Sequence, residues 1–250
     1  MTPPDLSGTT ALVTGATRGF GRAIAAALHD SGANVVAVAR DAERLGRLRS
    51  ELGVSLTTVT ADVADPVVAG SLVEQYRPKT LVLNAGAPPL MRPLQHQTWQ
   101  TFSRNWEVDV QQTFHWIRET LLLPLDPEST VIAMSSGAAV FGSPLSGGYA
   151  GAKAAIRFIT GYAADESSPA GLGIRFVSVL PKLTPATDLG AMAIAAYARR
   201  EGIHVDEYVK QQGPAIEPEH VGRHLANLAS STDQASGAYL LTPDGLSLLP

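Results

Sequence analysis

Three polar residues in the second half of the chain have types and a spacing that suit proton transfer. Tyr149 and Lys153 lie four residues apart in a stretch that begins a helix, so their side chains share one face. Ser136 ends an apolar run and precedes Tyr149 by thirteen residues. A phenol ionises only near pH ~10, and a nearby ammonium group stabilises its anion. By itself this spacing is more often structural, so the elements around it decide the interpretation.

A glycine-rich segment near the N-terminus has the properties of a phosphate site. Residues 14–21 read TGATRGFG, after an apolar run and before an amphipathic stretch. Gly15, Gly19 and Gly21 permit a tight turn and close approach of the backbone to a pyrophosphate. The first turn of the following helix would offer free N–H groups. An ordinary strand-to-helix turn is the simpler alternative.

The elements that must position these residues alternate regularly along the chain. Short runs rich in Val, Leu and Ile, typical of strands buried on both faces, occupy residues 10–14, 34–39, 56–60, 80–83, 131–134, 174–180 and 238–241. Helical spacing fills the stretches between them. The pattern predicts an α/β fold, a doubly wound parallel sheet of about seven strands with helices on both faces. We expect a single domain over residues 1–250, with a substrate lid at about 184–213.

Composition excludes several classes of protein. The 250 residues carry a net charge of −4 and contain no cysteine, so disulfides and thiolate metal sites are absent and no metal centre is expected. The mild acidity argues against nucleic-acid binding. No apolar run approaches the roughly 20 residues that span a bilayer. The N-terminal residues lack the pattern of a signal peptide, and we therefore expect a cytoplasmic protein that does not contact a membrane.

Taken together, these motifs resemble those of the short-chain dehydrogenase/reductase family over nearly the whole chain. Residues 14–21 match its TGxxxGxG fingerprint, and Tyr149 with Lys153 matches its YxxxK motif. Asn84-Ala85-Gly86 matches its NAG motif, and Asp62-Val63 matches the pair that borders the adenine. Each match is weak alone, but every one follows an apolar run in the expected order.

The resemblance implies a role for each matching residue. Tyr149 would donate a proton to a carbonyl oxygen, Ser136 would hydrogen-bond that oxygen, and Lys153 would bind the ribose of the nicotinamide and favour tyrosinate. Asp109 completes the implied catalytic set. The residues implied in cofactor binding are Gly15, Thr17, Arg18, Gly19, Phe20, Gly21, Arg40, Asp62, Val63, Asn84, Ala85, Gly86, Tyr149, Lys153, Pro181 and Thr184.

The second apolar run predicts which dinucleotide binds. NAD-binding relatives place a carboxylate at its end, where it bonds the ribose 2′-hydroxyl. Here the run ends in Ala39-Arg40, and Arg18 lies within the glycine-rich segment. A guanidinium fork suits a 2′-phosphate better than a diol, so NADP(H) is the expected cofactor. The alternative is that Arg40 pairs with Asp41 or Glu43 in solvent.

Two positions depart from the family pattern. Asp109 replaces an Asn that holds a water in a proton relay to the lysine, and Lys182 replaces a glycine beside the nicotinamide. Two interpretations stay open. Lys182 pairs with Asp109, or Lys182 faces solvent and Asp109 keeps the water bound. Thr184 lies near the usual carboxamide-binding threonine, although not at its usual spacing.

These observations predict an NADP(H)-dependent oxidoreductase that interconverts a ketone and a secondary alcohol, with a small-molecule carbonyl or alcohol as its substrate. Two alternatives remain: the fold performs non-redox chemistry such as dehydration or cyclisation, or it binds the cofactor as a regulator without turnover. Two helical stretches, within 106–121 and 149–163, resemble those that pair between subunits in the family. The resemblance therefore implies a homodimer or homotetramer.

Overall fold

The computed structural model describes residues 4–53, 55–231 and 234–250. Met1–Pro3, part of the N-terminal segment without a signal-peptide pattern, lie outside the described residues. Within these ranges one sheet has eight strands in the order β3-β2-β1-β4-β5-β6-β7-β8. The strands are β1 (Thr10–Thr14), β2 (Asn34–Ala39), β3 (Thr57–Thr60), β4 (Thr80–Leu83), β5 (Thr130–Met134), β6 (Arg175–Pro181), β7 (Gly237–Thr242) and β8 (Gly245–Leu248).

The predicted doubly wound parallel sheet is confirmed, with one strand more than expected. The first seven strands are parallel, and β8 pairs with β7 in the antiparallel direction. The β7–β8 hairpin turns at Pro243-Asp244, and Gly245 directly after the turn has a φ of +126° that favours glycine. Residues 245–248 form a short strand on the sheet edge and expose Leu248, so the hydropathy pattern there is too weak to predict a strand.

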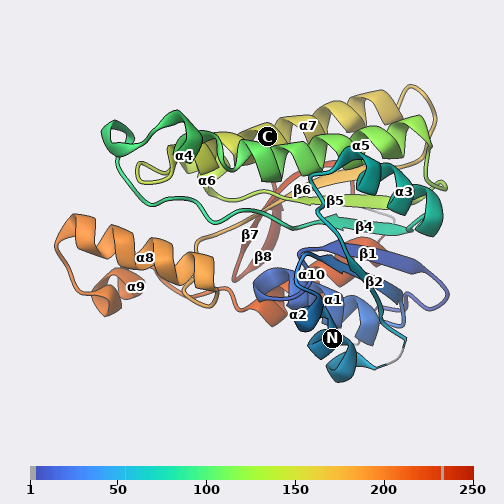
Figure 1. Cartoon of the computed structure of the whole chain (residues 1–250), viewed down its shortest axis with the longest axis horizontal. Helices are drawn as coiled ribbons and strands as arrows, with labels where there is room; N and C mark the ends of the chain where they lie inside the picture. The colour runs from blue at the N-terminus through green and yellow to red at the C-terminus, as the bar shows by residue number, and fades with distance from the viewer. Residues whose placement is uncertain (1–3, 54, 232–233) are drawn as a thin grey trace.

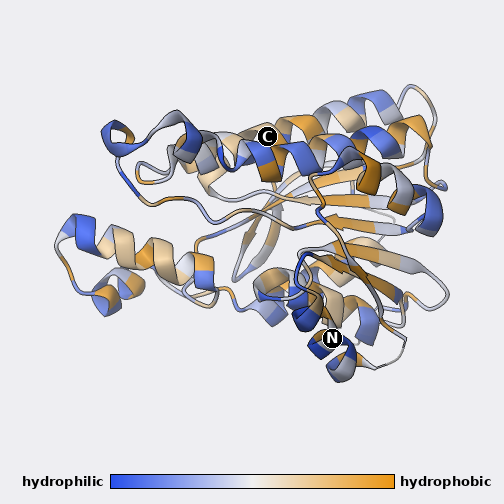
Figure 2. Cartoon of the chain, in the orientation of Figure 1, coloured by the Kyte–Doolittle hydropathy of each residue, from blue (hydrophilic) through white to orange (hydrophobic). Residues whose placement is uncertain are grey.

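Helices cover both faces of the sheet (Figure 1). On one face lie α1 (Gly19–Asp30), α2 (Ala42–Leu52) and α10 (Pro218–Ser230), and on the other lie α3 (Pro66–Tyr76), α5 (Gln111–Leu122) and α7 (Gly147–Ser167). Two apolar clusters, one on each side, pack these helices against the strands. Figure 2 shows the corresponding concentration of hydrophobic residues in the central strands.

Shorter elements surround the carboxyl ends of the strands. They are the 3₁₀ turn η1 (Leu94–His96), α4 (Trp99–Ser103), the π-helical turn η2 (Trp106–Val110) and α6 (Ala138–Phe141). After β6, the segment expected to be a lid forms α8 (Asp188–Glu201) and α9 (Val205–Gln212), which project from the sheet in Figure 1. Ile194, Ala198 and Tyr208 form a small apolar cluster of their own there.

Candidate active site

The glycine-rich segment forms a tight turn between β1 and α1. Gly15 and Gly19 have φ values of +64° and +51°, in the region that favours glycine. A Cβ on Gly21 would lie 2.1 Å from the Gly15 carbonyl oxygen, so no side chain fits at this crossing. Arg18 precedes α1 without capping it through its side chain. The backbone N–H groups of the first turn therefore remain suited to an anionic group, and the loop fits a pyrophosphate.

Asn84 ties the end of β4 to this turn. Its side-chain Nδ2 donates to the carbonyl oxygens of Thr14 and Gly15, at 3.1 and 3.3 Å. The Thr14 hydroxyl accepts in turn from the backbone N–H groups of Asn84 and Ala85, at 2.9 and 3.2 Å. Since β1 and β4 are the neighbours at which the strand order reverses, these bonds hold the sheet together at its topological switch point.

The residues expected around the adenosine lie at the ends of β2 and β3. The Val63 carbonyl oxygen accepts from the Trp116 indole at 2.9 Å, which anchors this loop to α5. Asp62 is exposed, and its carboxylate accepts from the Ala64 N–H. Ala39 is buried at the end of β2, and Arg40 after it is exposed. The segments after β2 and β3 thus present backbone and polar groups to the same edge of the sheet as the glycine turn.

The alternative that Arg40 pairs with a neighbouring carboxylate is wrong. Asp41 pairs with Arg44 and Glu43 pairs with Arg47, each within α2 or its N-cap. Within the described residues Arg40 makes no hydrogen bond or ion pair. Arg18 lies 3.5 Å from the Asp188 carboxylate at the start of α8, and both side chains are largely exposed. An exposed pair of this length stabilises the fold very little.

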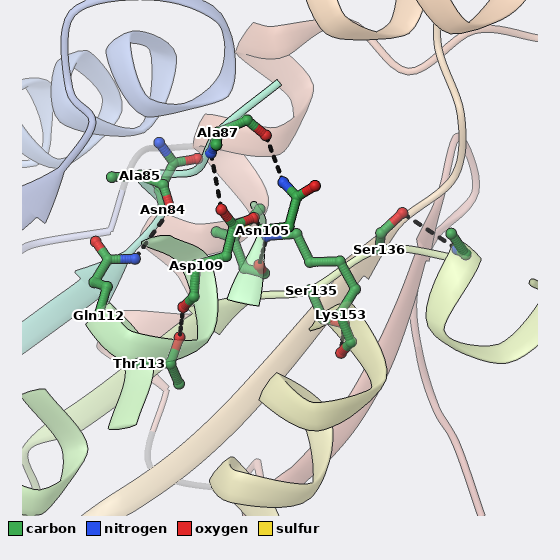
Figure 3. A network of polar contacts seen from close by, with 12 residues as sticks. Asn84, Ala85, Ala87, Asn105, Asp109, Gln112, Thr113, Ser135, Ser136 and Lys153 are labelled. Atoms are coloured by element: carbon green, nitrogen blue, oxygen red, sulfur yellow. Dashed lines mark hydrogen bonds and ion pairs between the residues drawn. The ribbon is translucent and has the colours of Figure 1, made fainter. Parts of the chain in front are cut away.

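Ser136 and Tyr149 lie on either side of α6, at the carboxyl edge of the sheet. The Ser136 Oγ accepts from the Ala138 N–H at 3.2 Å, which leaves its own proton free to donate (Figure 3). Tyr149 is half-buried in the first turn of α7, and the ammonium of Lys153 lies 5.5 Å from its ring centroid. Among the described residues, the Tyr149 hydroxyl has no hydrogen-bond partner. Both hydroxyls are therefore available to a substrate oxygen.

Lys153 is buried beneath this site, with one hydrogen-bond acceptor and one ion-pair partner. Its Nζ donates to the Met134 carbonyl oxygen at 3.0 Å and lies 3.1 Å from Oδ2 of Asp109. Burial lowers the pKa of the Lys153 ammonium, but attraction to Asp109 and Tyr149 outweighs burial and holds the pKa above its usual value. The lysine is therefore charged throughout the neutral range.

The contacts of the loop after β6 exclude one of the two interpretations of Lys182, namely its pairing with Asp109. Lys182 does not pair with Asp109, because its Nζ donates to the Gln212 carbonyl oxygen at 2.8 Å, at the end of α9. Pro181 is buried, and its carbonyl oxygen accepts from the Gly137 N–H. The Thr184 hydroxyl donates to the Ile216 carbonyl oxygen at 2.8 Å. These contacts fasten the lid segment at both of its ends.

Two residues outside the predicted site set, Asn105 and Gln112, complete the network around Asp109. Asn105 lies one turn before Asp109, and its Nδ2 donates to the Ala87 carbonyl oxygen at 2.6 Å (Figure 3). Gln112 donates to the Ala85 carbonyl oxygen at 3.0 Å. Polar residues at helical spacing in a stretch with buried neighbours were the available signal, because a buried polar side chain needs a partner.

Comparison with known proteins agrees with the fold and with the motifs. The family model for short chain dehydrogenases matches residues 9–197. This chain belongs to the short-chain dehydrogenase/reductase family. Family membership accounts for the order of the glycine turn, the NAG motif and the Ser136–Tyr149–Lys153 set along the chain.

Relatives of this chain include a dehydrogenase and a reductase. Serine 3-dehydrogenase of Rhizobium radiobacter is 36% identical over 186 residues, which cover 69% of this chain and 70% of that protein. Carbonyl reductase (NADPH) 2 of Sus scrofa is 30% identical over 182 residues, 72% of this chain and 74% of that protein.

Solved structures of the family share the fold. A short-chain dehydrogenase/reductase of Brucella melitensis superposes with a TM-score of 0.82 at 23% identity and covers 96% of both chains. L-Sorbose reductase of Gluconobacter frateurii, solved with NADPH and L-sorbose, gives a TM-score of 0.79 at 23% identity and covers 96% of this chain and 97% of that one.

Two further findings concern membranes and metals. Over residues 4–53, 55–231 and 234–250, no helix is both long and apolar enough to cross a membrane. Over the same residues, no three side chains of His, Cys, Asp or Glu gather as metal ligands. His220 and His224 stack on α10 with ring centroids 4.7 Å apart.

Proposed function

We propose that this protein is an NADP(H)-dependent oxidoreductase that interconverts a ketone and a secondary alcohol, with Tyr149 as the general acid and base. One observation carries the proposal. Ser136 follows β5, Lys153 bonds the end of β5 through Met134 and lies beside the Tyr149 ring, and the glycine turn follows β1, whose carboxyl end lies at the same edge of the sheet. A small carbonyl or alcohol is the class of substrate that this arrangement can polarise and protonate.

Each catalytic side chain has a task that its contacts support. When bound, the nicotinamide cofactor supplies or accepts the hydride. In the reductive direction Tyr149 gives its phenolic proton to the carbonyl oxygen, and in the oxidative direction it takes the proton back. Ser136 donates a hydrogen bond to that oxygen, and the Lys153 ammonium stabilises the tyrosinate that remains.

The cofactor-binding residues fit a dinucleotide with a 2′-phosphate. The glycine turn suits the pyrophosphate. Arg40 is exposed and has no ion pair among the described residues, and Ala39 before it offers no carboxylate to a ribose diol. Arg18 is held only by a long exposed contact and can turn to the phosphate. The name of one relative, carbonyl reductase (NADPH) 2, supports this preference.

The lid and the cellular setting form part of the same proposal. We infer one catalytic domain over the whole chain, with α8 and α9 covering the substrate. Tyr197 of α8 hydrogen-bonds Ser143 in the loop before α7, which joins the lid to the catalytic side of the site. The enzyme would work in the cytoplasm, as the sequence suggested.

Substituting the proton donor tests the proposal. The protein is mixed with NADPH and a panel of ketones, and both cofactor oxidation and product mass are followed. Tyr149→Phe is expected to lower turnover by a factor of about 10² or more while NADPH binding is nearly retained. Tyr162→Phe, which removes an exposed phenol from the same helix, serves as the control.

The outcomes separate the proposal from its alternatives. Parent-like turnover in Tyr149→Phe would refute the assigned proton donor. A product that forms without NADPH oxidation would indicate the non-redox alternative, and binding without any product would indicate a regulator. Cofactor loss that matches alcohol formation supports the oxidoreductase.

A further inference from the structure

The carboxylate of Asp109 is buried between a backbone N–H group and the catalytic lysine. Asp109 is 1% exposed, and Lys153 is 5% exposed. Oδ1 accepts from the Ala87 N–H at 2.8 Å, while Oδ2 lies 3.1 Å from the Lys153 ammonium. Figure 3 shows that this contact joins η2 to α7 directly. One buried carboxylate thus bridges the NAG loop and the lysine.

The geometry requires a carboxylate at position 109. The Ala87 N–H needs an acceptor, so it determines which oxygen of residue 109 faces it. Asn105 holds the carbonyl group of the same residue, which prevents Ala87 from turning away. An asparagine side chain would then point its NH₂ group at the Lys153 ammonium, and two donors would face each other. A carboxylate instead places one oxygen on the Ala87 N–H and its other, negatively charged oxygen beside the Lys153 ammonium.

The backbone of η2 and the glycine at position 86 both accommodate the Asp109 carboxylate. The Asn105 carbonyl oxygen accepts from both Asp109 N–H and Val110 N–H, which produces the π-helical turn. The Asp109 carbonyl oxygen accepts from the Thr113 hydroxyl at 2.9 Å, so it is already engaged within the helix. A Cβ on Gly86 would lie 2.8 Å from Oδ2, and the glycine of the NAG motif therefore leaves space for the anion.

From these contacts we propose that Asp109 is a positioning residue, a fixed counter-ion that holds the Lys153 ammonium charged beside Tyr149 through a direct ion pair in place of a water-mediated link. The role in cofactor binding rests on the proposed function, in which the enzyme uses NADP(H), and on the family resemblance, which implies that Lys153 binds the ribose of the nicotinamide. The ion pair itself stands on the buried contact alone. Removing one partner of such a pair leaves an uncompensated buried charge.

Few charged groups face Lys153 from the elements packed against it. Among the described residues, Asp109 faces it from η2 and Tyr149 from α7, while β5 contributes the Met134 carbonyl oxygen. Glu107, also in η2, points elsewhere and accepts from the Ser103 hydroxyl at 2.8 Å. Without Asp109, only Tyr149 would still oppose the effect of burial on the pKa of Lys153, so we expect that pKa to fall.

Titration of the lysine side chains by NMR tests the ion pair without any need for turnover. The chain has only four lysines, so the Nζ signal of Lys153 is assigned by comparison with Lys153→Met. In the parent protein we expect Lys153 to lose its proton at a higher pH than the other three lysines. In Asp109→Asn the midpoint should fall by about two pH units or more, and in Glu107→Gln it should not move.

The NADPH dissociation constant measured against pH tests the consequence for the cofactor. In Asp109→Asn, affinity should begin to fall at the lowered midpoint, by up to about tenfold per pH unit, while the parent and Glu107→Gln keep their affinity there. A shifted titration with an unmoved affinity profile would overturn the positioning role.

The remaining outcomes test the Asp109–Lys153 ion pair and the proposed function separately. Equal Lys153 midpoints in the parent and in Asp109→Asn would overturn the ion pair. If Asp109→Asn does not fold, the titration of the parent still tests the ion pair. A Lys153 midpoint below those of the other lysines contradicts the proposal. Failure of the parent to bind NADPH would refute the proposed function, and the titration would still judge the ion pair.

Discussion

At the residue scale, the network around Lys153 differs from the family pattern at position 109, where a carboxylate replaces an amide. An amide at position 109 would leave Lys153 to find its partner through water, whereas the carboxylate contacts the ammonium directly. Gly86 allows this approach, because any side chain there would meet the Asp109 oxygens. The second departure, Lys182, serves the lid segment and takes no part in the network around Asp109.

The residue scale also governs the choice of cofactor. Ala39 cannot accept from a 2′-hydroxyl, and Arg40 can bind a 2′-phosphate. NADPH should therefore bind at least about tenfold more tightly than NADH, a difference of about 1.4 kcal/mol. The double variant Ala39→Asp, Arg40→Ala should reverse the order. Calorimetric titration with both cofactors measures the ratio, with Arg49→Ala near the end of α2 as the control. Equal dissociation constants in the parent would contradict the assignment.

At the element scale, helix termini and turns place the functional groups. The π-helical turn η2 interrupts the helix that leads into α5 and brings both Asn105 and Asp109 to Ala87. At the start of α8, the Thr187 side chain accepts from the Gly190 N–H and caps the lid helix. Helix α8, which we propose as part of the lid, thus begins beside the glycine turn, where a Cβ on Gly19 would lie 3.7 Å from the Thr187 methyl group.

A half-buried histidine of α10, His224, is expected to make the free energy of unfolding depend on pH. Burial first, then the charges of His220 and Arg223, lower the pKa of His224 below its usual value. The folded protein then binds fewer protons than the unfolded chain, so this contribution is complete above about pH 6.5 and is lost as the pH falls below it. The urea midpoint should decrease between pH 7.5 and 5.5. His224→Gln should decrease less, whereas the exposed control His96→Gln should follow the parent. Parallel decreases in all three proteins would contradict this prediction.

At the scale of the whole molecule, the reversal of strand order between β1 and β4 brings the two halves of the site together. The glycine turn follows β1, the NAG motif follows β4, and Ser136 follows β5. All three strands are parallel, so these segments leave the sheet at the same edge. Lys153 then approaches that edge from α7 and joins it through Met134 and Asp109.

The outer face of α5 and α7 leads to a prediction about assembly. Phe114, Leu122, Phe158 and Tyr162 expose from 50% to 63% of their surface there. Such a face favours burial against a second copy, and we expect a symmetric dimer or tetramer. Phe158→Glu with Tyr162→Glu should reduce the assembly to smaller species in sedimentation experiments. Val205→Glu on α9 should leave its size unchanged. A monomeric parent would refute the expectation.

The sequence by itself predicted seven of the eight described strands, the glycine turn and, through the family motifs, the candidate residues Ser136, Tyr149 and Lys153. These features are local, since hydrophobic period, turn chemistry and spacing within a helix are read from neighbouring residues. Only the tertiary structure decided the partner of Asp109, the contact of Lys182 with α9 and the pairing of the short strand β8. Each of these depends on which distant backbone or side-chain group lies opposite in the fold. For a buried carboxylate, the group that satisfies it is chosen by packing between elements, and the order of residues along the chain does not contain that choice.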